Sequence, residues 1–175
     1  MAKRANMMEF GYEERAEKGT LIALDSFERW TADDLARVVA EAHLRKFTKI
    51  VLFPHHEKTL KSMGESGVSP YHARVKKLRH LVDEQRSTIP IAIDNWEEKR
   101  KKYTPIELIL RYFEESYRPP YFLYLSDRYA NQFSAFASFE ACIKKVRLLI
   151  WQQDRTDLTA RLMQYSHRFD IVVSE

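Results

Sequence analysis

Short apolar segments alternate along the chain with segments whose apolar residues follow a helical period. Each apolar segment is bounded by polar residues, Gly or Pro, a pattern typical of a buried strand. These segments predict strands at residues 20–24, 49–53, 89–93, 121–125, 146–151 and 170–173. Pro90 within the third segment predicts either an edge strand or the first residue of a strand, because Pro cannot donate a hydrogen bond to a neighbouring strand.

Helical periodicity occupies the intervals between these strands. The first helix begins after Thr31, which supplies a polar cap, and the acidic residues Asp33 and Asp34 follow in its first turn. One face of this helix carries apolar residues at the spacing i, i+3, i+4 and i+7, namely Leu35, Val38, Val39 and Ala42. Further helices are predicted at residues 57–63, 73–83, 105–113, 138–145 and 159–165.

The alternation of strands and helices predicts the fold class. The strands are apolar throughout rather than at every second residue, which indicates a mainly parallel sheet covered by helices on both faces. We therefore predict a doubly wound, Rossmann-like α/β protein, whose ligands would lie beyond the carboxyl ends of the strands. The length of 175 residues suits one domain at residues 19–175, preceded by a polar arm or tail at residues 1–18.

Composition adds limits on partners and location. The 29 Lys and Arg residues exceed the 25 Asp and Glu residues by 4, a mild excess that permits an anionic partner without requiring a nucleic acid. Cys142 is the single cysteine, which excludes a disulfide framework and suits the reducing cytoplasm, where we expect this protein. No apolar run approaches the roughly 18 residues of a membrane helix, so no membrane partner is expected.

Glycine placement excludes two common nucleotide-binding classes. Only 4 Gly residues occur, and none lies at a predicted strand-to-helix turn. The glycine-rich phosphate loops of dinucleotide-binding dehydrogenases and of P-loop NTPases are therefore both absent.

Polar clusters follow two of the predicted strands. His55-His56-Glu57 comes directly after strand 49–53 and could bind a metal or an anion, or act as an acid or base near neutral pH. The alternative is an exposed loop that leads into a short helix, and no third and fourth ligands follow at the spacing of a metal site. Segment 94–98 is acidic and segment 99–102 is basic, so together they could bind Mg²⁺ and a phosphate, or form a solvated loop.

Three further features have a chemical and a structural interpretation. Asp127, after strand 121–125, could bind a ribose hydroxyl or a metal, or it could cap a helix. Cys142 lies among apolar residues, so we expect burial rather than reactivity. The polar positions of the helix predicted at 73–83 carry the basic residues Arg74, Lys76, Lys77 and Arg79. These residues form either a solvated face or, alternatively, an RNA-binding face.

Several segments also match a known family in order and in spacing. Residues 49–58 look like the family's second strand with its Pro-His-Lys segment, and residues 72–78 look like a helix that begins with a His-Arg or Glu-Arg pair. Residues 103–108 look like a Tyr-Thr-x-x-Thr-Leu segment, and residues 122–127 look like a strand that ends in Gly-x-Asp. Residues 133–151 fit the helix and strand that follow. From Leu21 to about Trp151 the chain thus resembles nicotinate-mononucleotide adenylyltransferases, members of the HIGH-motif nucleotidylyltransferase superfamily.

The resemblance fails at the segments that bind ATP in that family. Residues 24–29 take the place of Gly-Gly-Ser/Thr-Phe-Asp-Pro, and residues 31–34 take the place of His-x-Gly-His, so both glycines and both histidines are missing. Leu125-Ser126-Asp127 replaces Gly-x-Asp, and the sequence ends near residue 175, where an Ile-Ser-Ser-Thr-x-Ile-Arg segment would begin. Each carboxylate of Asp33 and Asp34 would repel a phosphate charge about 4 Å away by roughly 4 kcal/mol at an effective dielectric constant near 20.

These departures lead to a specific expectation about function. We expect a nucleotidylyltransferase-like protein without adenylyltransferase activity and without a catalytic residue, a bound metal or a cofactor. Its expected role is to bind a mononucleotide or another small anionic ligand, or to act as a regulator. The candidate ligand-binding residues are Ser26, Thr31, His55, His56, Lys58, Tyr103, Thr104 and Asp127.

Two alternatives remain open. The first is an active Mg²⁺-dependent nucleotidylyltransferase, in which Asp25, Asp33 or Asp34 would hold the metal. The second is a nucleic-acid or protein interaction module that uses the basic residues at 74–79 and 99–102.

Overall fold

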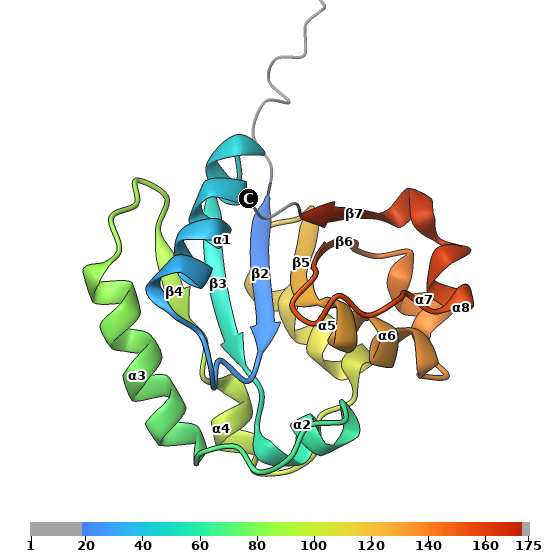
Figure 1. Cartoon of the computed structure of the whole chain (residues 1–175), viewed down its shortest axis with the longest axis horizontal. Coiled ribbons are helices and arrows are strands. Elements are labelled where there is room, and N and C mark those ends of the chain that lie inside the picture. Colours follow the sequence, from blue (N-terminus) through green and yellow to red (C-terminus); the bar gives the residue numbers. More distant parts are fainter. Residues whose placement is uncertain (1–18, 173–175) are drawn as a thin grey trace, which may run out of the picture.

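The central feature of the protein is a six-stranded sheet in which all neighbouring strands are parallel (Figure 1). The structure is a computed structural model that describes residues 19–172, so the expected arm at residues 1–18 and Val173 of the last predicted strand lie outside the described residues. The strands lie in the order β4 (Ile91–Ile93), β3 (Lys49–Pro54), β2 (Thr20–Asp25), β5 (Tyr121–Ser126), β6 (Arg147–Trp151) and β7 (Phe169–Val172). The predicted doubly wound α/β fold is confirmed.

Helices cover both faces of this sheet. The face that carries Leu21 and Ala23 of β2 packs against α1 (Ala32–Leu44) and α3 (Tyr71–Glu84). The opposite face, with Ile22 and Leu24, packs against helices α2 (Glu57–Ser62), α5 (Ile106–Ser116), α6 (Asp127–Ala135), α7 (Phe139–Ile143) and α8 (Ala160–Met163). Because successive residues of a strand point to opposite faces, a strand that is apolar throughout contributes to both halves of the core.

Strand order brings distant polar residues together. The order of the strands reverses beside β2, because β3 lies on one side of it and β5 on the other. Asp25 pairs in register with Pro54, and Ala23 pairs with Tyr124. The residues that follow β2, β3 and β5 therefore meet at one edge of the sheet, where ligands bind in folds of this type.

Several element boundaries differ from the predictions. Helices α4 (Trp96–Arg100) and α6 were not predicted, and α6 begins directly after β5 with Ser126 as its N-cap. The helices predicted at 138–145 and 159–165 span only Phe139–Ile143 and Ala160–Met163, and a 3₁₀ turn (Ser166–Arg168) precedes β7. Short helices have too few turns to show a period, so their ends are not fixed by the apolar pattern.

The prediction for the third strand is confirmed. Strand β4 lies at the edge of the sheet and begins immediately after Pro90. The carbonyl oxygen of Pro90 accepts a hydrogen bond from Ile50 N at 2.9 Å.

Among the helices of residues 19–172, none has the length and apolar character needed to cross a lipid bilayer.

Candidate functional site

Two carboxylates meet at the carboxyl end of β2. Asp25 Oδ1 accepts a hydrogen bond from Phe27 N at 2.9 Å, in a tight turn where Phe27 has a φ of 62°. Ser26 Oγ lies 3.3 Å from Asp25 Oδ1 and 3.2 Å from Glu65 Oε2, so the two acids share one hydroxyl group. The hydroxyl group of Tyr129, on α6, donates a hydrogen bond to Glu65.

Burial changes the acidity of this cluster. Loss of solvation raises the pKa of Asp25 to about 6, and the negative charge of Glu65 adds to the rise. The hydrogen bond from Phe27 N acts in the opposite direction but is the weaker influence. Burial also raises the pKa of Tyr129, which is therefore a hydrogen-bond donor at neutral pH. Burial thus favours the protonated form of Asp25 to a higher pH than is usual for an aspartate.

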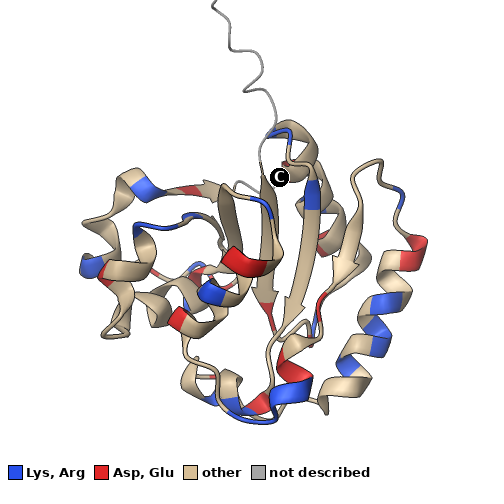
Figure 2. Cartoon of the chain, turned by 180° about the vertical axis from the view of Figure 1, so that it is seen from behind, with Lys and Arg blue, Asp and Glu red and all other residues tan. Residues whose placement is uncertain are grey.

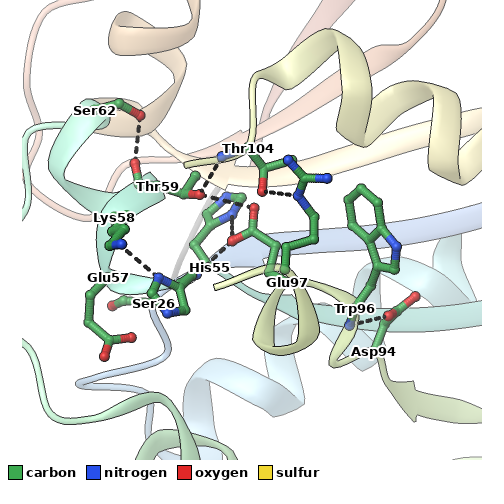
Figure 3. A network of polar contacts seen from close by, with 12 residues as sticks. Ser26, His55, Glu57, Lys58, Thr59, Ser62, Asp94, Trp96, Glu97 and Thr104 are labelled. Carbon is green, nitrogen blue, oxygen red and sulfur yellow. Dashed lines mark hydrogen bonds and ion pairs between the residues drawn. The ribbon is translucent and has the colours of Figure 1, made fainter. Parts of the chain in front are cut away.

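A second buried carboxylate lies at the carboxyl end of β3 (Figure 3). Glu97, on α4, is fully buried, and its Oε1 accepts a hydrogen bond from His56 N at 2.6 Å. Its Oε2 accepts a hydrogen bond from Thr59 Oγ1 at 3.2 Å, and His55 Nδ1 lies 3.5 Å from Oε1, an ion-pair distance rather than a hydrogen bond. Burial acts to raise the pKa of Glu97, but the proximity of His55 and these hydrogen bonds outweigh it and hold the pKa below its usual value.

Thr104 completes this cluster from the start of α5. Its backbone N–H donates to Thr59 Oγ1 at 3.1 Å, and its Oγ1 accepts from Arg100 Nε at 3.0 Å. Thr104 is almost completely buried, and its polar groups are engaged within the protein. It therefore connects α2, α4 and α5 beneath the sheet edge.

Arg74 joins the two strand ends, which corrects the prediction that it lies on a solvated face. Its side chain is 2% exposed. Nη1 donates to the carbonyl oxygens of Ser26 and His55, each at 2.9 Å, while Nε donates to Ser69 O at 2.8 Å and Nη2 pairs with Glu57 at 2.9 Å. The polar pattern of α3 could not separate Arg74 from its neighbours, because a guanidinium group can be buried wherever the chain supplies enough acceptors.

The remaining basic residues of α3 are exposed. Lys76, Lys77 and Arg79 lie on the solvent side, as predicted, and Figure 2 shows basic residues repeated along this helix.

The expected alternatives for segments 55–57 and 94–98 also need correction. His55 is buried, so this segment is not an exposed loop, although Glu57 begins a helix as predicted. Asp94 and Glu97 are buried as well, so segment 94–98 is not a solvated loop. Asp94 Oδ2 accepts hydrogen bonds from the hydroxyl groups of Tyr112 and Tyr117.

The N-terminus of α1 is capped by its own side chains, as the sequence predicts. Thr31 N donates to Asp34 Oδ2 at 2.8 Å, and Asp34 N donates to Thr31 Oγ1 at 3.4 Å. Arg37 pairs with the second carboxylate oxygen of Asp34 at 3.2 Å. This reciprocal arrangement is a capping box, which satisfies two of the backbone N–H groups that a helix start leaves free.

Aromatic side chains fill the space beside this helix start. Trp30 is 2% exposed, and its ring lies 4.5 Å from that of Phe27, 6.5 Å from that of Tyr124 and 6.0 Å from that of Trp151, measured between centroids. Trp151 also stacks on Tyr124. The sheet edge next to α1 is therefore occupied by packed rings.

Asp127 anchors a loop. Its carboxylate is fully buried, Oδ2 accepts from Thr156 N at 2.7 Å, and Oδ1 accepts from Arg128 N at 2.9 Å and from Asp154 N at 3.4 Å. It is the first residue of α6, while the N-cap is Ser126. Both oxygens of Asp127 are engaged in holding the segment that follows β6.

His56 and Lys58 flank the start of α2. His56 is the N-cap, because its Nδ1 accepts a hydrogen bond from Lys58 N at 3.2 Å, and its ring lies beside that of Tyr71. Lys58 is exposed, and its Nζ donates to Lys101 O at 3.3 Å.

Two small cavities lie at this edge of the sheet. The polar cavity, of about 30 Å³, is lined by Asp25, Ser26, Glu65 and Tyr129 among others. The apolar cavity, of about 20 Å³, is lined by Leu24, His55, Met63, Tyr103, Thr104 and Tyr129 among others. Tyr129 is a wall of both cavities.

The structure separates the eight candidate residues into two sets. Ser26 lines the polar cavity, and His55, Tyr103 and Thr104 line the apolar cavity. The other four candidates line neither cavity: Thr31, His56, Lys58 and Asp127.

Arg74, Glu97, Glu65 and Tyr129 were not identified as site residues from the sequence. For Glu65, the sequence offers one local signal, the nearby residues Gly64 and Gly67. Both have positive φ values, which glycine adopts readily in a turn.

No arrangement for a metal ion is found in the described part of the chain. Within residues 19–172, no three side chains of His, Cys, Asp or Glu converge as metal ligands would. Asp34 is already paired with Thr31 and Arg37. Of the three acids that the sequence offered for Mg²⁺, Asp25 and Asp34 therefore already have partners within the protein.

Comparisons with known proteins support the fold at low sequence identity. No family model and no curated protein matches the sequence. Among solved structures, Plasmodium falciparum nicotinic acid mononucleotide adenylyltransferase complexed with NaAD matches with a TM-score of 0.66 and 13% identity over 87% of this chain and 74% of that chain. The same enzyme complexed with APC matches with a TM-score of 0.63 and 10% identity over 88% of this chain and 74% of that one. The chain therefore has a Rossmann-like fold of the kind seen in nicotinic acid mononucleotide adenylyltransferases, as the sequence predicted.

Proposed function

We propose that this chain is a nucleotidylyltransferase-like protein that binds a mononucleotide or another small anionic ligand and does not transfer an adenylyl group. The observation that carries the proposal is the capping box at the start of α1, where Thr31 and Asp34 use the backbone N–H groups at that end. A helix N-terminus binds phosphate through those N–H groups and through the positive end of the helix dipole. Here Asp34 N donates to Thr31 Oγ1, Thr31 N donates to the carboxylate of Asp34, and that carboxylate lies at the positive end of the helix dipole.

Local charge supports the same conclusion. Asp33 and Asp34 lie in the first turn of α1, and Glu28 and Glu65 line the neighbouring polar cavity together with Asp25. A triphosphate would have to approach several carboxylates, and each pair of like charges costs roughly 4 kcal/mol at about 4 Å and an effective dielectric constant near 20. The exposed Arg29 and Arg128 at the rim of the cavity offset only part of this repulsion.

Packing provides a separate argument against ATP binding. The rings of Trp30, Tyr124 and Trp151 contact one another at the sheet edge beside α1. Trp30 is almost completely buried, so a nucleotide on this side would need to displace a packed indole group. Removal of a buried Trp from such a cluster costs about 3–5 kcal/mol.

The ligand-binding part of the proposal rests on the other side of the sheet edge. The phenol ring of Tyr103 is 43% exposed and lies at the wall of the apolar cavity, where it can stack on a base. Lys58, which is exposed nearby on α2, supplies the positive charge for a phosphate group. The solved neighbours are complexes with NaAD and with APC, which supports the choice of nucleotides as probes.

Thermal unfolding with a set of ligands tests the proposal. The purified chain is unfolded with nicotinate mononucleotide, with ATP plus Mg²⁺, and with NaAD. A ligand present at 100 times its dissociation constant adds about 2.7 kcal/mol, which raises the unfolding temperature by several degrees for a domain of this size. The proposal predicts a rise with the mononucleotide and none with ATP plus Mg²⁺.

Matched variants locate the ligand. Tyr103→Ala should reduce the rise given by the mononucleotide by at least half, and Lys58→Ala should weaken binding in a way that added salt masks. Leu44→Ala is the control, because Leu44 is the most exposed large apolar residue of the described chain and lies on α1 away from both cavities. An equal rise in all three variants would place the ligand elsewhere and contradict the assignment of this pocket.

Other outcomes favour the alternatives. A rise with ATP plus Mg²⁺, together with pyrophosphate release, would establish the active enzyme. No rise with any nucleotide, combined with RNA binding that weakens steeply with salt, would favour the interaction module and its exposed residues Lys76, Lys77 and Arg79.

A further inference from the structure

Residues 64–70, here called the lid segment, connect α2 to α3 and pass across the carboxyl end of β2 (Figure 1). The segment is held to the sheet edge mainly by polar contacts. Glu65 contacts Ser26 and Tyr129, and Gly64 O accepts from Arg128 Nη2 at 3.4 Å. At the other end of the segment, Ser69 donates to Glu28 through its N at 2.6 Å and its Oγ at 2.9 Å.

The backbone of the lid segment is suited to a change of conformation. Gly64 and Gly67 have φ values of 82° and 74°, a region that glycine enters without steric cost. No heavy atom lies within 4 Å of the position that a Cβ would take at Gly67. The middle of the segment at Gly67 is therefore not closely packed, while Val68 packs against the apolar core and Ser69 O accepts a hydrogen bond from Arg74 Nε.

The polar cavity lies against this segment, and the apolar cavity lies against the residue that precedes it. Glu65 and Asp25 line the polar cavity, and Met63, directly before the lid segment, lines the apolar cavity. Tyr129 separates the two, and its hydroxyl group is held by Glu65. Movement of Glu65 away from the sheet would release Tyr129 and join the two cavities.

We propose that residues 64–70 form a lid over the site and that ionisation of Asp25 opens it. Asp25 and Glu65 share the single hydroxyl group of Ser26, which can donate its hydrogen to only one of them. When both acids are charged, they repel each other across the hydroxyl group of Ser26. Opening lets water reach Asp25 and removes the repulsion.

Other polar and charged groups also face Asp25. His55 approaches from the end of β3, the Trp30 indole from the turn before α1, and the Tyr129 hydroxyl from α6. The wall of the polar cavity also carries charged side chains, namely Glu28, Arg29, Arg128 and Asp154. Arg29 and Arg128 are exposed, so water weakens their effect on the carboxylates. Two groups nearby are buried: His55 acts to lower the pKa of Asp25, and Arg74 donates to Ser26 O, but burial of Asp25 outweighs them.

The direction of the pH effect follows from linkage between opening and proton release. Burial and the charge of Glu65 raise the pKa of Asp25 to about 6 with the lid closed, and contact with water would return it toward 3.8. Opening therefore releases a proton between those two values, so the open-to-closed ratio rises about tenfold per pH unit from about pH 4 to about pH 6. Above about pH 6 the ratio levels off, roughly 100-fold higher than at pH 4.

Hydrogen exchange tests the lid without any ligand, so its outcome is independent of the proposed function. Exchange of the backbone amides of Glu65 and Ser69, which donate hydrogen bonds to Leu60 O and to Glu28, is followed from pH 4.5 to pH 7.5 and corrected for the intrinsic rate. Protection should fall about 15-fold between pH 4.5 and pH 6, and level off at about 25-fold below its initial value by pH 7.5. Strand β5, in the same sample, reports global opening and should not follow this change.

Four variants separate the lid from a general loss of stability. Asp25→Asn should keep the lid segment protected at every pH, and Glu65→Ala should leave it unprotected at every pH. Glu65→Gln keeps a hydrogen-bonding side chain without the charge, so it should restore protection at pH 7. Glu115→Gln removes a carboxylate from an exposed position of α5 and should behave as the natural protein does.

Two results would overturn the proposal. One is protection that is constant with pH in the natural chain, and the other is a pH dependence that persists in Asp25→Asn. If Glu65→Ala does not fold, Asp25→Asn and Glu65→Gln still decide between a lid and a fixed loop.

Discussion

Two buried carboxyl groups at neighbouring strand ends differ in how the chain treats their charge. Asp25 follows β2 and faces a second acid, Glu65, so burial prevails and raises the pKa of Asp25 to about 6. Glu97 lies against the end of β3, where His55 and hydrogen bonds from His56 and Thr59 hold its pKa low in spite of complete burial. The comparison shows that the partners of a buried acid, and not burial alone, decide whether its charge stabilises the fold.

The largest expected effect comes from Arg74, which bonds to both strand ends. Arg74→Ala removes the donors for Ser26 O and His55 O and leaves Glu57 without its partner. Loss of one partner from a buried charged network costs about 3–5 kcal/mol. Denaturant unfolding should show this loss, while Arg79→Ala, on the exposed side of the same helix, should stay within about 0.5 kcal/mol of the natural chain.

The second largest effect is expected for Glu97→Gln, which tests whether the charge of Glu97, unlike that of Asp25, stabilises the fold. The amide keeps one acceptor for His56 N but loses the charge that His55 faces, so we expect a loss of about 2–3 kcal/mol at neutral pH. Thermal unfolding measures it, and Glu98→Gln at the adjacent, less buried position is the control. Unchanged stability would mean that the carboxylate at Glu97 does not stabilise the fold.

Asp25→Asn should increase the stability of the fold above pH 6, whereas Glu97→Gln should reduce it. Between pH 4 and pH 6 the unfolded chain gives up the proton of Asp25 while the folded chain keeps it, so the stability of the natural protein falls as the pH rises through this window and then levels off. A rise of about two pKa units corresponds to about 3 kcal/mol. Weaker hydrogen bonding by the amide reduces the expected gain at pH 8 to about 1–2 kcal/mol, and at pH 4 it makes the variant slightly less stable than the natural protein.

Unfolding of both proteins at pH 4 and pH 8 checks the sign of this effect. A destabilised Asp25→Asn at pH 8 would show that the charged acid is favourable and would remove the contrast with Glu97.

The smallest effect concerns the start of α1. Thr31→Ala removes the side-chain acceptor for Asp34 N and should cost about 1 kcal/mol. The carboxylates of Asp33 and Asp34 remain, so the variant should still give no rise in unfolding temperature with ATP plus Mg²⁺. A rise in the variant would show that the cap, and not the charge, keeps phosphate out.

The sequence predicted the parts of the molecule that depend on local pattern. Continuous apolar strands indicated the parallel sheet, and Thr31 followed by two acidic residues indicated the polar cap and first turn of α1. Contacts between distant segments could not be predicted in this way. Arg74 reaches the ends of two strands, and Glu65 lies 39 residues from Ser26, so neither role leaves a periodic signal.

Candidate site residues show the same division. Ser26 and His55, which follow a strand directly, line the cavities. Asp127 also follows a strand, but its two oxygens are engaged by backbone groups of a loop that the apolar pattern does not describe. Position along a strand thus predicts where a side chain lies but not what occupies its hydrogen bonds.

Pyrophosphate release tests the central claim most directly. The chain is incubated with ATP, nicotinate mononucleotide and Mg²⁺, and the same sample is unfolded with the mononucleotide alone to show that its pocket is intact. The account predicts binding of the mononucleotide and no pyrophosphate above the level without protein. Pyrophosphate that increases with protein concentration and saturates with both substrates would contradict it.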